Sequence, residues 1–379
     1  MPWEEVNTVD LRSEFVILAE HKRCTFEALC RRYNISRKTG YKWLKRYRQQ
    51  GLDGLDDYSR RPLHQPAKTS NAIEMIILKC REQYPDWGGR KLKRVLENQG
   101  YQNIPSPSTI TEVLRRHNCL TKDSSNQAPF IRFEHPYPND LWQMDFKGHF
   151  GMARRRCHPL TVLDDHSRYS LCLKACPNEQ TDTVKDALIQ TFKRYGLPRR
   201  MTMDNGAPWG SAGNSRFTQL TVWLIEQGIR ISHSTPYHPQ TQGKDERFHR
   251  TMKAELLGRR QFDNLAHCQT GFDAWRTQYN TVRPHEALNM DTPAMHYEPS
   301  SQSYRTNKQS YEYGVNDQER KVGRNLVAYF KGYEVFVGEA FMGRYVAFRP
   351  TLEDGKYDLY YCHQKVGNID LNKMKKRTY

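Results

Sequence analysis

The sequence predicts a multidomain protein that is α-helical in its N-terminal part, α/β in the middle and β in its C-terminal part. Three observations lead to this fold class. Apolar residues recur at helical spacing up to about residue 120, strand-like and helical runs alternate up to about residue 300, and short aromatic-rich runs with turn signals follow. A chain of 379 residues is long enough for several domains of ordinary size.

The charge balance is the strongest bulk signal. Lys and Arg total 59 against 42 Asp and Glu, which gives a formal net charge of +17. Such a balance predicts a polyanionic partner, either nucleic acid or an anionic membrane surface. No apolar run approaches the roughly 18 residues of a spanning helix, and the first ten residues are polar and acidic, unlike a secretory signal. We therefore expect a cytoplasmic protein without a membrane partner.

The nine cysteines are scattered, and none forms a Cys-x2-Cys pair. Structural zinc sites use two close ligand pairs. The pattern therefore predicts reduced and mostly buried thiols.

Two short helices joined by a tight turn are predicted from Thr25 to Tyr47. Thr25 and Ser36 are typical cap residues, and Asn34-Ile35 forms the turn, so the pair predicts a helix-turn-helix motif. A recognition helix meets base edges with its N-terminal half. The candidate DNA-binding side chains there are Arg37, Lys38, Thr39 and Lys42. The alternative is an ordinary helical hairpin with a basic solvated face, but the net charge favours DNA.

A second helical unit is predicted after residue 70. Apolar residues at helical spacing mark helices around Ile73–Cys80 and Leu92–Leu96, and Ser108 is the expected cap of a third. Arg115 and Arg116 would point outward from this third helix and are further DNA-binding candidates. The unit resembles a second helix-turn-helix, with a plain three-helix spacer as the alternative.

Polar, Pro-containing stretches set the predicted domain boundaries. Arg60 and Arg61 lie in the first of these linkers, where they are candidates for phosphate contacts. The predicted segments are a helix-turn-helix DNA-binding domain at 1–50, a linker at 51–70, a second helix-turn-helix-like domain at 71–124, a linker at 125–138, an α/β core at 139–300, a linker at 301–321 and a small β domain at 322–379.

The central segment has the element order of a mixed sheet. The stretch Trp142–Lys147 alternates between apolar and polar residues, and two further strands follow it in a meander. A helix at Asp182–Tyr195, a strand at Met201–Asp204, a helix near Ser215–Gln227 and a strand at Ile229–Ser232 come next. This order predicts a ribonuclease-H-like core, with helices on both faces of the sheet.

Three sequence blocks in this segment make the prediction specific. They are Leu141-Trp-Gln-Met-Asp-Phe146, Met203-Asp-Asn-Gly206 and His238-Pro-Gln-Thr-Gln-Gly-Lys-Asp-Glu-Arg-Phe-His-Arg250. They resemble the signature blocks of the retroviral-integrase-type catalytic core in bacterial insertion-sequence transposases of the DDE superfamily. The run Tyr279-Asn280, Arg283-Pro-His285 and Thr292-Pro-Ala294 is similar to the stretch that follows the core in that family.

The resemblance implies that Asp145, Asp204 and Glu246 are catalytic and metal-binding residues. Two Mg²⁺ ions, for which Mn²⁺ is expected to substitute, suit in-line displacement at phosphorus, and such hard cations favour carboxylate oxygens. Asp245 stands where the family is expected to have an apolar or neutral residue. Both acidic neighbours therefore remain candidates for the position that faces the metals.

Other charged residues near these blocks have simpler or additional interpretations. Asp164 and Asp165 lie in a turn between strands, where capping explains them well. Glu246, Arg250 and Lys253 are spaced i, i+4 and i+7 and so share one helix face, on which a DNA end is expected to bind. Lys244 and Arg247 complete the DNA-binding candidates in this block. The alternative for Arg250 is a surface ion pair with Glu246.

Short aromatic-rich strands are predicted from about Val322 onward, with a hairpin turn at Asp354-Gly355. This pattern resembles the small SH3-like barrel that follows the core in integrases. Its interleaved basic and aromatic residues would suit contacts with a nucleic-acid backbone; they are Lys331, Tyr333, Arg344, Tyr345, Arg349 and Lys356.

The function implied by the family is DNA transposition. The expected partners are double-stranded DNA, as element ends and as target, and further copies of the chain on paired ends, within a bacterial cytoplasm and close to the nucleoid. A DNA-binding regulator that has lost catalysis is the main alternative, although the presence of all three carboxylates argues against it. A nucleic-acid packaging protein is more distant, since it would need no carboxylate triad.

Overall fold

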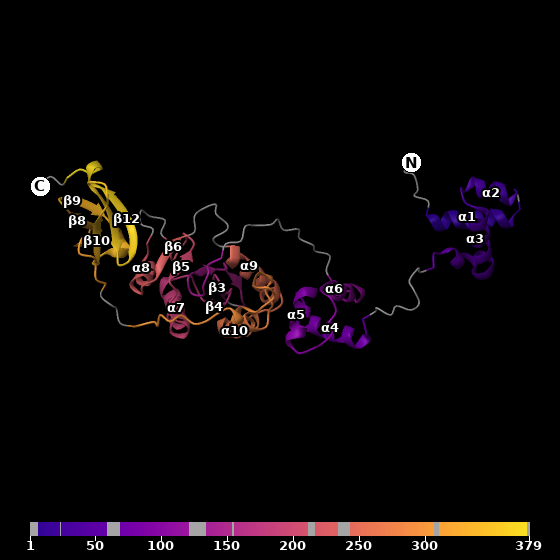
Figure 1. Ribbon diagram of the computed structural model, residues 1–379, viewed down its shortest axis with the longest axis horizontal. Coiled ribbons are helices and arrows are strands. Elements are labelled where there is room, and N and C mark those ends of the chain that lie inside the picture. The colour runs from indigo at the N-terminus through magenta and orange to yellow at the C-terminus, as the bar shows by residue number, and fades with distance from the viewer. Residues whose placement is uncertain are drawn as a thin grey trace. The chain divides into compact units, whose positions relative to one another are not determined.

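The computed structural model divides the chain into two compact units, Met1–Lys68 and Thr69–Tyr379 (Figure 1). It describes residues 7–22, 24–58, 69–120, 134–153, 155–210, 217–233, 243–306 and 311–376. In this described part, no helix combines the length and the apolar character needed to cross a membrane.

The first unit is a three-helix domain. Its elements are α1 (Thr8–Glu20), α2 (Phe26–Arg32), α3 (Arg37–Gln50) and the 3₁₀ helix η1 (Gly51–Leu55). The predicted caps are confirmed, because Thr25 accepts a hydrogen bond from Ala28 N and Ser36 accepts one from Thr39 N. Leu55 is fully buried in the core of this unit. The folded part therefore extends past residue 50, into the stretch that the sequence assigned to the linker.

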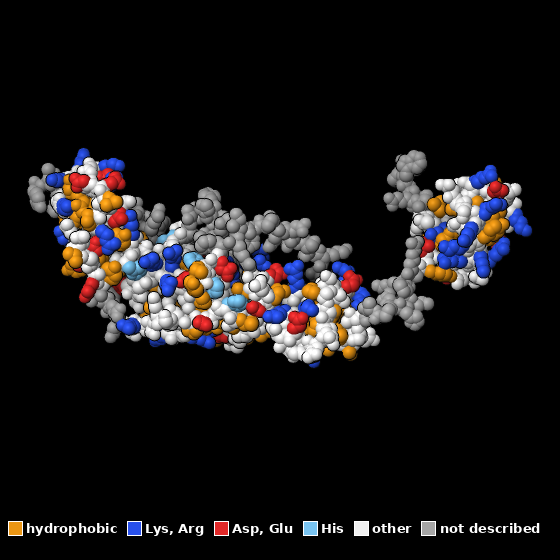
Figure 2. Space-filling view, viewed as in Figure 1, with side chains coloured by type: hydrophobic (Ala, Val, Ile, Leu, Met, Phe, Trp, Pro, Cys, Tyr) orange, Lys and Arg blue, Asp and Glu red, His pale blue; other side chains and the backbone are white. Residues whose placement is uncertain are grey.

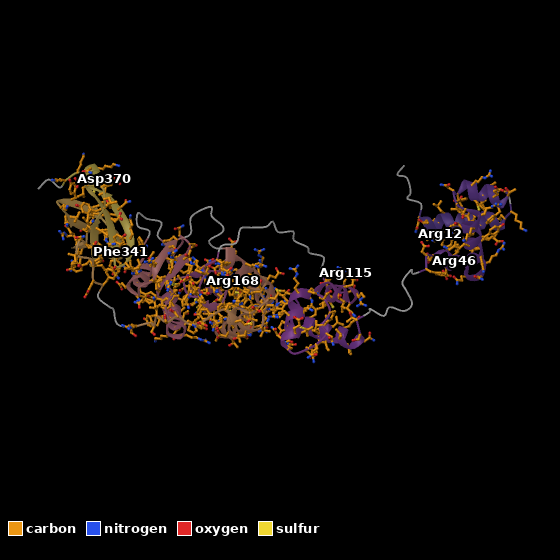
Figure 3. The ribbon with its side chains drawn as sticks, viewed as in Figure 1. Arg12, Arg46, Arg115, Arg168, Phe341 and Asp370 are labelled. Carbon is orange, nitrogen blue, oxygen red and sulfur yellow. The ribbon has the colours of Figure 1, made fainter. Side chains whose placement is uncertain are left out.

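Basic side chains gather on the visible face of this unit (Figure 2). Two of them, Arg12 and Arg46 (Figure 3), place their guanidinium carbons 3.9 Å and 5.0 Å from the ring centroid of Trp43. Cation–π contacts of this kind fix the arginines against the helices. These two arginines therefore support the fold beside the candidate recognition helix α3.

Three more helices open the second unit. They are α4 (Asn71–Gln83), α5 (Gly89–Asn98) and α6 (Pro107–Arg116), and they enclose a core of their own. The cap of α6 is Ser106, which accepts a hydrogen bond from Thr109 N, and Pro107 occupies the first turn. The prediction of Ser108 as the cap was wrong. Pro107 is well suited to the first helical position, so the helix begins before Ser108.

The central sheet is mixed, as predicted. Its strand order is β2-β3-β1-β5-β6, with β4 on the other edge of β3. Strand β1 pairs antiparallel with β3 and parallel with β5, and β5 pairs parallel with β6. The strands are β1 (Trp142–Phe146), β2 (Phe150–Gly151), β3 (Arg156–Asp164), β4 (Ser170–Cys176), β5 (Arg200–Met203) and β6 (Arg230–His233).

Helices cover both faces of this sheet. The buried clusters assign α7 (Thr181–Tyr195) and α8 (Gln219–Glu226) to one face and α9 (Gly243–Met252) and α10 (Leu265–Thr281) to the other. A π-helical turn, η3 (Lys253–Leu257), continues α9, and two short 3₁₀ helices follow α10 (Glu286–Leu288 and Pro293–Met295). The predicted architecture of the core is confirmed.

The motif after α10 has a structural role. The side chain of Asn280 accepts a hydrogen bond from Ser170 N at 2.8 Å and donates one to Ser170 O at 3.0 Å, so it holds the start of β4 as a neighbouring strand would. Both residues are buried. This bridge joins the end of α10 to the strand that follows the Asp164–Arg168 turn.

The C-terminal strands form two separate sheets. Strands β12 (Gln364–Asp370), β11 (Lys356–Tyr361), β10 (Tyr345–Pro350) and β7 (Gln318–Lys321) form one, and β8 (Val327–Phe330) with β9 (Tyr333–Phe336) forms the other. The predicted hairpin between β10 and β11 is confirmed, and Gly355 in its turn has φ +76°. The two sheets pack through stacked Phe330 and Phe348 rings. No ladder joins them among the described residues, so the predicted closed barrel is not confirmed.

The nine cysteines are all free and all lie in the described part of the chain. Six are buried, Cys119 and Cys362 are half-buried, and Cys24 is exposed. The Sγ atoms of Cys157 and Cys268 lie 3.7 Å apart inside the core without a bond between them. The prediction of mostly buried thiols is confirmed.

Candidate functional site

Asp145 lies near the C-terminal end of β1, which is paired on both of its edges. Alternation turns Trp142 and Met144 toward the α7 side of the sheet and Asp145 toward the opposite side. Its carboxylate is only partly exposed. Burial and the nearby negative charge of Asp204 raise the pKa of Asp145 to about 7. The site therefore brings together negative charges that a cation would neutralise.

Asp204 follows β5 directly. The parallel register pairs Trp142 with Met201 and Gln143 with Thr202, and the same register continued places Asp145 beside Asp204. The Oδ1 atom of Asp204 accepts hydrogen bonds from Gly206 N at 3.0 Å and from Trp209 Nε1. These bonds fix the carboxylate in the turn after the strand. Two of the three predicted carboxylates are thus brought together.

Glu246 and Asp245 occupy opposite environments at the start of α9. Asp245 is 1% exposed, and neither of its carboxylate oxygens has a hydrogen-bond partner among the described residues. Burial, and to a smaller extent the negative charge of Asp145, raises the pKa of Asp245 well above its usual value. Glu246 is exposed, and its charge contributes to the raised pKa of Asp145. Asp245 therefore faces inward, whereas Glu246 lies at the surface beside the site.

The sequence itself contained a signal for the burial of Asp245. Asp245, Phe248 and Met252 are spaced i, i+3 and i+7, so they share a helix face. Phe248 and Met252 are apolar and are buried in the core. The burial of Asp245 follows from this shared face.

His249 is a site residue that the sequence analysis missed. Thr161 Oγ1 donates a hydrogen bond to Asp145 O at 2.9 Å, and its single proton is then used. His249 Nε2 lies 2.9 Å from Thr161 Oγ1 and must therefore donate the hydrogen bond in that contact. The Nδ1 atom of His249 is left as an acceptor 3.9 Å from Asp145 Oδ2. Burial and the charge of Lys147 lower the pKa of His249 to about 4, so the ring is neutral at pH 7.

Lys147 is a second missed residue. It lies two residues after Asp145, on the same side of the chain, and is half-buried. Burial and the neighbouring charge of Lys253 lower its pKa. Lys147, which follows β1, and Lys253, which follows α9, are therefore close enough for their charges to interact. The alternation that identified Asp145 also pointed to Lys147.

The Asp164–Arg168 turn is a buried polar centre. Asp164 accepts hydrogen bonds from Ser167 N at 2.8 Å and Ser167 Oγ at 2.6 Å, which confirms its capping role. Asp165 is 1% exposed and accepts hydrogen bonds from Gln143 Nε2 and His135 N. Lys244 Nζ lies 2.6 Å from Asp165 Oδ1. This ion pair joins the turn to the first residues of α9.

Lys244, one of the predicted DNA-binding residues, is engaged within the protein. Its side chain is 13% exposed and its ammonium group is held by Asp165, so it does not present a free charge to a phosphate. Burial lowers the pKa of Lys244 to about 8. The position of Lys244 follows from the helix: it lies four residues before Phe248, next to the buried face of α9.

The other DNA-binding candidates fall into four groups. Arg37, Lys38 and Lys42 are exposed on α3, and Thr39 is half-buried against Ser36. Arg247, Arg250 and Lys253 are exposed along α9 and η3, and no ion pair joins Arg250 to Glu246 in the described structure. Arg115 pairs with Glu112, and Arg116 pairs with Glu74 at 2.8 Å. Arg60 and Arg61 lie outside the described residues.

Two of the C-terminal cations are also engaged within the protein. Arg344 Nε lies 2.9 Å from Glu226 Oε1 of α8, and Arg349 forms two hydrogen bonds of 2.8 Å with Asp317. These contacts hold the C-terminal sheet together and against the core. The interleaved basic residues of this region therefore serve structure as well as surface charge.

The donor chemistry of the site fits a hard divalent cation. Asp145 and Asp204 supply carboxylate oxygens, which Mg²⁺ prefers, and burial with mutual repulsion raises the pKa of Asp145 in the absence of a countercharge. Within the described ranges, no three His, Cys, Asp or Glu side chains are close enough together to hold one ion. Glu246, on the exposed side of α9, is the carboxylate that does not join the other two.

Family models match five parts of the chain. Two models described as Integrase core domain match residues 135–239 and 227–293. A Helix-turn-helix domain model matches residues 12–62, and a Homeodomain-like domain model matches residues 39–114. The C-terminal domain of the IS481 family transposases matches residues 317–377. Together these matches cover the helical region, the core and the C-terminal strands.

Similar solved structures come from retroviruses. One chain comes from the structure of the simian T-cell lymphotropic virus intasome in complex with the PP2A regulatory subunit B56 gamma. It is 16% identical to this chain, with a TM-score of 0.38, and the match covers 76% of this chain and 98% of that chain. The catalytic core domain of HTLV-2 integrase, in complex with magnesium, is 17% identical, with a TM-score of 0.33 over 42% of this chain and 97% of that chain.

Two curated relatives come from bacterial insertion elements. An uncharacterised 31.7 kDa protein of IS407 from Burkholderia multivorans (strain ATCC 17616 / 249) is 25% identical over 244 residues, which cover 62% of this chain and 85% of the relative. An uncharacterised 39.2 kDa protein of IS476 from Xanthomonas euvesicatoria is 30% identical over 157 residues, or 41% of this chain and 44% of the relative. The integrase-core and IS481 matches, together with these relatives, support a bacterial insertion-sequence transposase with a retroviral-integrase-type core.

Proposed function

We propose that this chain is an active DNA transposase that binds the terminal inverted repeats of a mobile element and catalyses strand cleavage and strand transfer. The observation that carries this proposal is the adjacency of Asp145 and Asp204 at the ends of two parallel strands, with Glu246 on the helix beside them. The reaction class is phosphodiester hydrolysis followed by transesterification.

Asp145, Asp204 and Glu246 would hold two Mg²⁺ ions, with Mn²⁺ as a substitute. Bound there, the ions would activate the attacking oxygen and stabilise the leaving one. The protein's own residues orient the carboxylates: Trp209 and Gly206 donate to Asp204, while Thr161 links the backbone of Asp145 to His249. Lys147 and Lys253 would attract the scissile-strand phosphates.

The proposed partners are element-end DNA, target DNA and further copies of the chain on paired ends. The helix-turn-helix units would recognise the ends, and the C-terminal strands would assist DNA or subunit contacts. A location in the bacterial cytoplasm, close to the nucleoid, follows from this role.

A strand-nicking and joining assay tests the proposal. The full-length protein is mixed with labelled DNA that carries an element end, with and without Mg²⁺. We expect Mg²⁺-dependent cleavage and joining of the end. End-specific binding without any cleavage in Mg²⁺ or Mn²⁺ would identify the alternative, a DNA-binding regulator that has lost catalysis.

Sequence specificity is predicted to lie in α3. Arg37→Ala and Lys42→Ala should each weaken binding to end DNA by about 1–3 kcal/mol, because base-edge contacts contribute in this range. Binding to scrambled DNA should change much less. The measurement is a set of titrations with both DNAs across a salt series. Equal losses on both DNAs would instead make α3 a phosphate clamp.

Lys253 is predicted to hold the DNA end beside the carboxylates. Lys253→Ala should lower cleavage and joining together, by about tenfold, since a charge-assisted phosphate contact is lost while the carboxylates remain. Arg250→Ala is the matched comparison on the same helix face. A single-turnover cleavage assay with titrated Mg²⁺ measures both variants. If Arg250→Ala were the costlier change and Lys253→Ala nearly neutral, Arg250 would instead orient Glu246.

A further inference from the structure

Glu255 occupies an unusual position directly after the helix of Glu246. It lies in η3, a π-helical turn in which Gly258 N donates to Lys253 O at 2.8 Å. Its carboxylate side chain is 7% exposed. Single π-helical turns within α-helices are rare and occur frequently at functional sites. A buried carboxylate in such a turn needs partners, and these come from three separate places in the fold.

Three donors converge on this carboxylate. Trp87 Nε1 donates to Oε1 at 3.0 Å, Arg283 Nε lies 2.9 Å from the same oxygen, and Trp275 Nε1 donates to Oε2 at 3.3 Å. Trp275 and Arg283 belong to α10 and the motif that follows it. Trp87 belongs to the helical domain of α4–α6, between α4 and α5. Glu255 is therefore bonded to the core and to a candidate DNA-binding domain at once.

The bond from Trp87 joins two domains that are distant in sequence. Trp87 is 1% exposed and stacks on Tyr84, with ring centroids 3.9 Å apart. A buried indole N–H that lost its acceptor would cost the free energy of desolvating it, so the bond constrains both sides. A second contact lies next to it, where Arg259 donates to Asp86 at 2.8 Å. The Arg259–Asp86 pair does not involve Glu255, and its side chains are more exposed than that of Glu255.

Movement at Glu255 would be transmitted to α9. η3 continues α9 without interruption, and Met252 and Leu256 anchor this stretch in the core. Glu246 lies on the same continuous helix, on its exposed side. A displacement of the buried carboxylate would therefore shift or loosen the segment that carries Glu246, whereas Asp145 and Asp204 are fixed separately by the sheet.

We propose that Glu255 is a positioning residue that links seating of the α4–α6 domain on the core to the placement of Glu246. This inference rests on the proposed function, because it assigns to end recognition a direct mechanical effect on the catalytic helix. The hydrogen bond from Trp87 to Glu255 forms when the α4–α6 domain is seated on the core. Glu255 itself touches no substrate.

The test compares Trp87→Phe, which removes the indole N–H, with Glu255→Gln and with the double variant in the full-length protein. Trp87→Phe should lower single-turnover cleavage at saturating end DNA by about tenfold, the expected effect of losing a hydrogen bond to a charged group. DNA affinity should stay unchanged. The double variant should be no slower than Glu255→Gln alone. Arg259→Gln, the matched control, should cleave at nearly the wild-type rate.

Three results would overturn the proposal. One is a loss of DNA affinity with an unchanged rate at saturation. Another is a double variant whose cleavage rate falls by the product of the fold-losses of Trp87→Phe and Glu255→Gln. The third is an Arg259→Gln defect as large as that of Trp87→Phe, which would show that domain seating acts without Glu255.

Hydrogen exchange of the α9 peptide provides a readout independent of catalysis. Trp87→Phe and Glu255→Gln should each speed exchange there without adding to one another, and Arg259→Gln should not. If wild-type protein cleaved no DNA but showed this pattern, the proposed function would fail while the coupling stood. Unchanged α9 exchange in both Glu255→Gln and Trp87→Phe would overturn the coupling even in an active enzyme.

Discussion

Glu246→Gln is expected to abolish end cleavage and joining, with a fall of about 10³-fold or more, because a carboxylate that holds a catalytic cation contributes several kcal/mol to the transition state. End binding should remain close to that of the wild type, since the substitution removes a proposed metal ligand and not a DNA contact. The measurement is single-turnover cleavage alongside a binding titration of the same DNA. Strand transfer by this variant at the wild-type rate would contradict the assignment.

Asp245→Asn is the matched control on the neighbouring position. The carboxylate of Asp245 is buried without hydrogen-bond partners in the described structure, so an uncharged amide of the same size should be tolerated and activity largely kept. The two substitutions are at adjacent positions, but Asp245→Asn changes the buried face of α9 and Glu246→Gln changes the exposed face. If Asp245→Asn were inactive and Glu246→Gln active, Asp245 would be the metal ligand.

Asp165→Ala is expected to cause the largest loss of stability. The substitution leaves the Lys244 ammonium group buried without its partner and removes the acceptor of Gln143 Nε2 and His135 N. Removing one partner of a buried ion pair costs about 3–5 kcal/mol. The loss should appear in urea unfolding of the full-length protein and in faster hydrogen exchange of the β1 peptide.

Lys244→Met serves as the comparison for this prediction. Asp165 would keep its hydrogen bonds from Gln143 and His135, so the cost should be smaller than that of Asp165→Ala. Methionine also fills most of the space left by the lysine stem. Equal losses for both variants would mean that the charge pair, and not the hydrogen-bonded carboxylate, determines the stability of this turn.

The sequence was sufficient where local patterns carry the information. Alternation in β1 separated Asp145 from Trp142 and Met144, and cap residues located α2 and α3. The choice between Asp245 and Glu246 was harder, because adjacent helical residues point about 100° apart and the packing of α9 on the core decides which one is buried. The spacing of Asp245 to Phe248 and Met252 indicates that Asp245 is the buried residue of the two, and the assignment of Glu246 to the metals stays a prediction from the family pattern.

Long-range contacts could not be predicted from one sequence. Trp87 and Glu255 are 168 residues apart, and neither position belongs to a pattern that indicates the other. The same holds for the pairing of β7 with β10, which places residues before and after the β8–β9 hairpin in one sheet. The hairpin turn at Gly355 was local and therefore predictable, whereas closure of a barrel depends on non-local pairing.

The distribution of the cysteines has a practical consequence for spectroscopy. Among the nine, all within the described residues, Cys24 is the exposed one, and it lies in the first helix-turn-helix unit. Thiol reagents react with accessible thiolates, and burial in apolar surroundings suppresses that reaction. A maleimide dye applied briefly to the native protein should therefore mark this unit ahead of the half-buried Cys119 and Cys362. Energy transfer from that dye to a fluorophore on an element end would then follow the approach of this unit to DNA without a cysteine-free background.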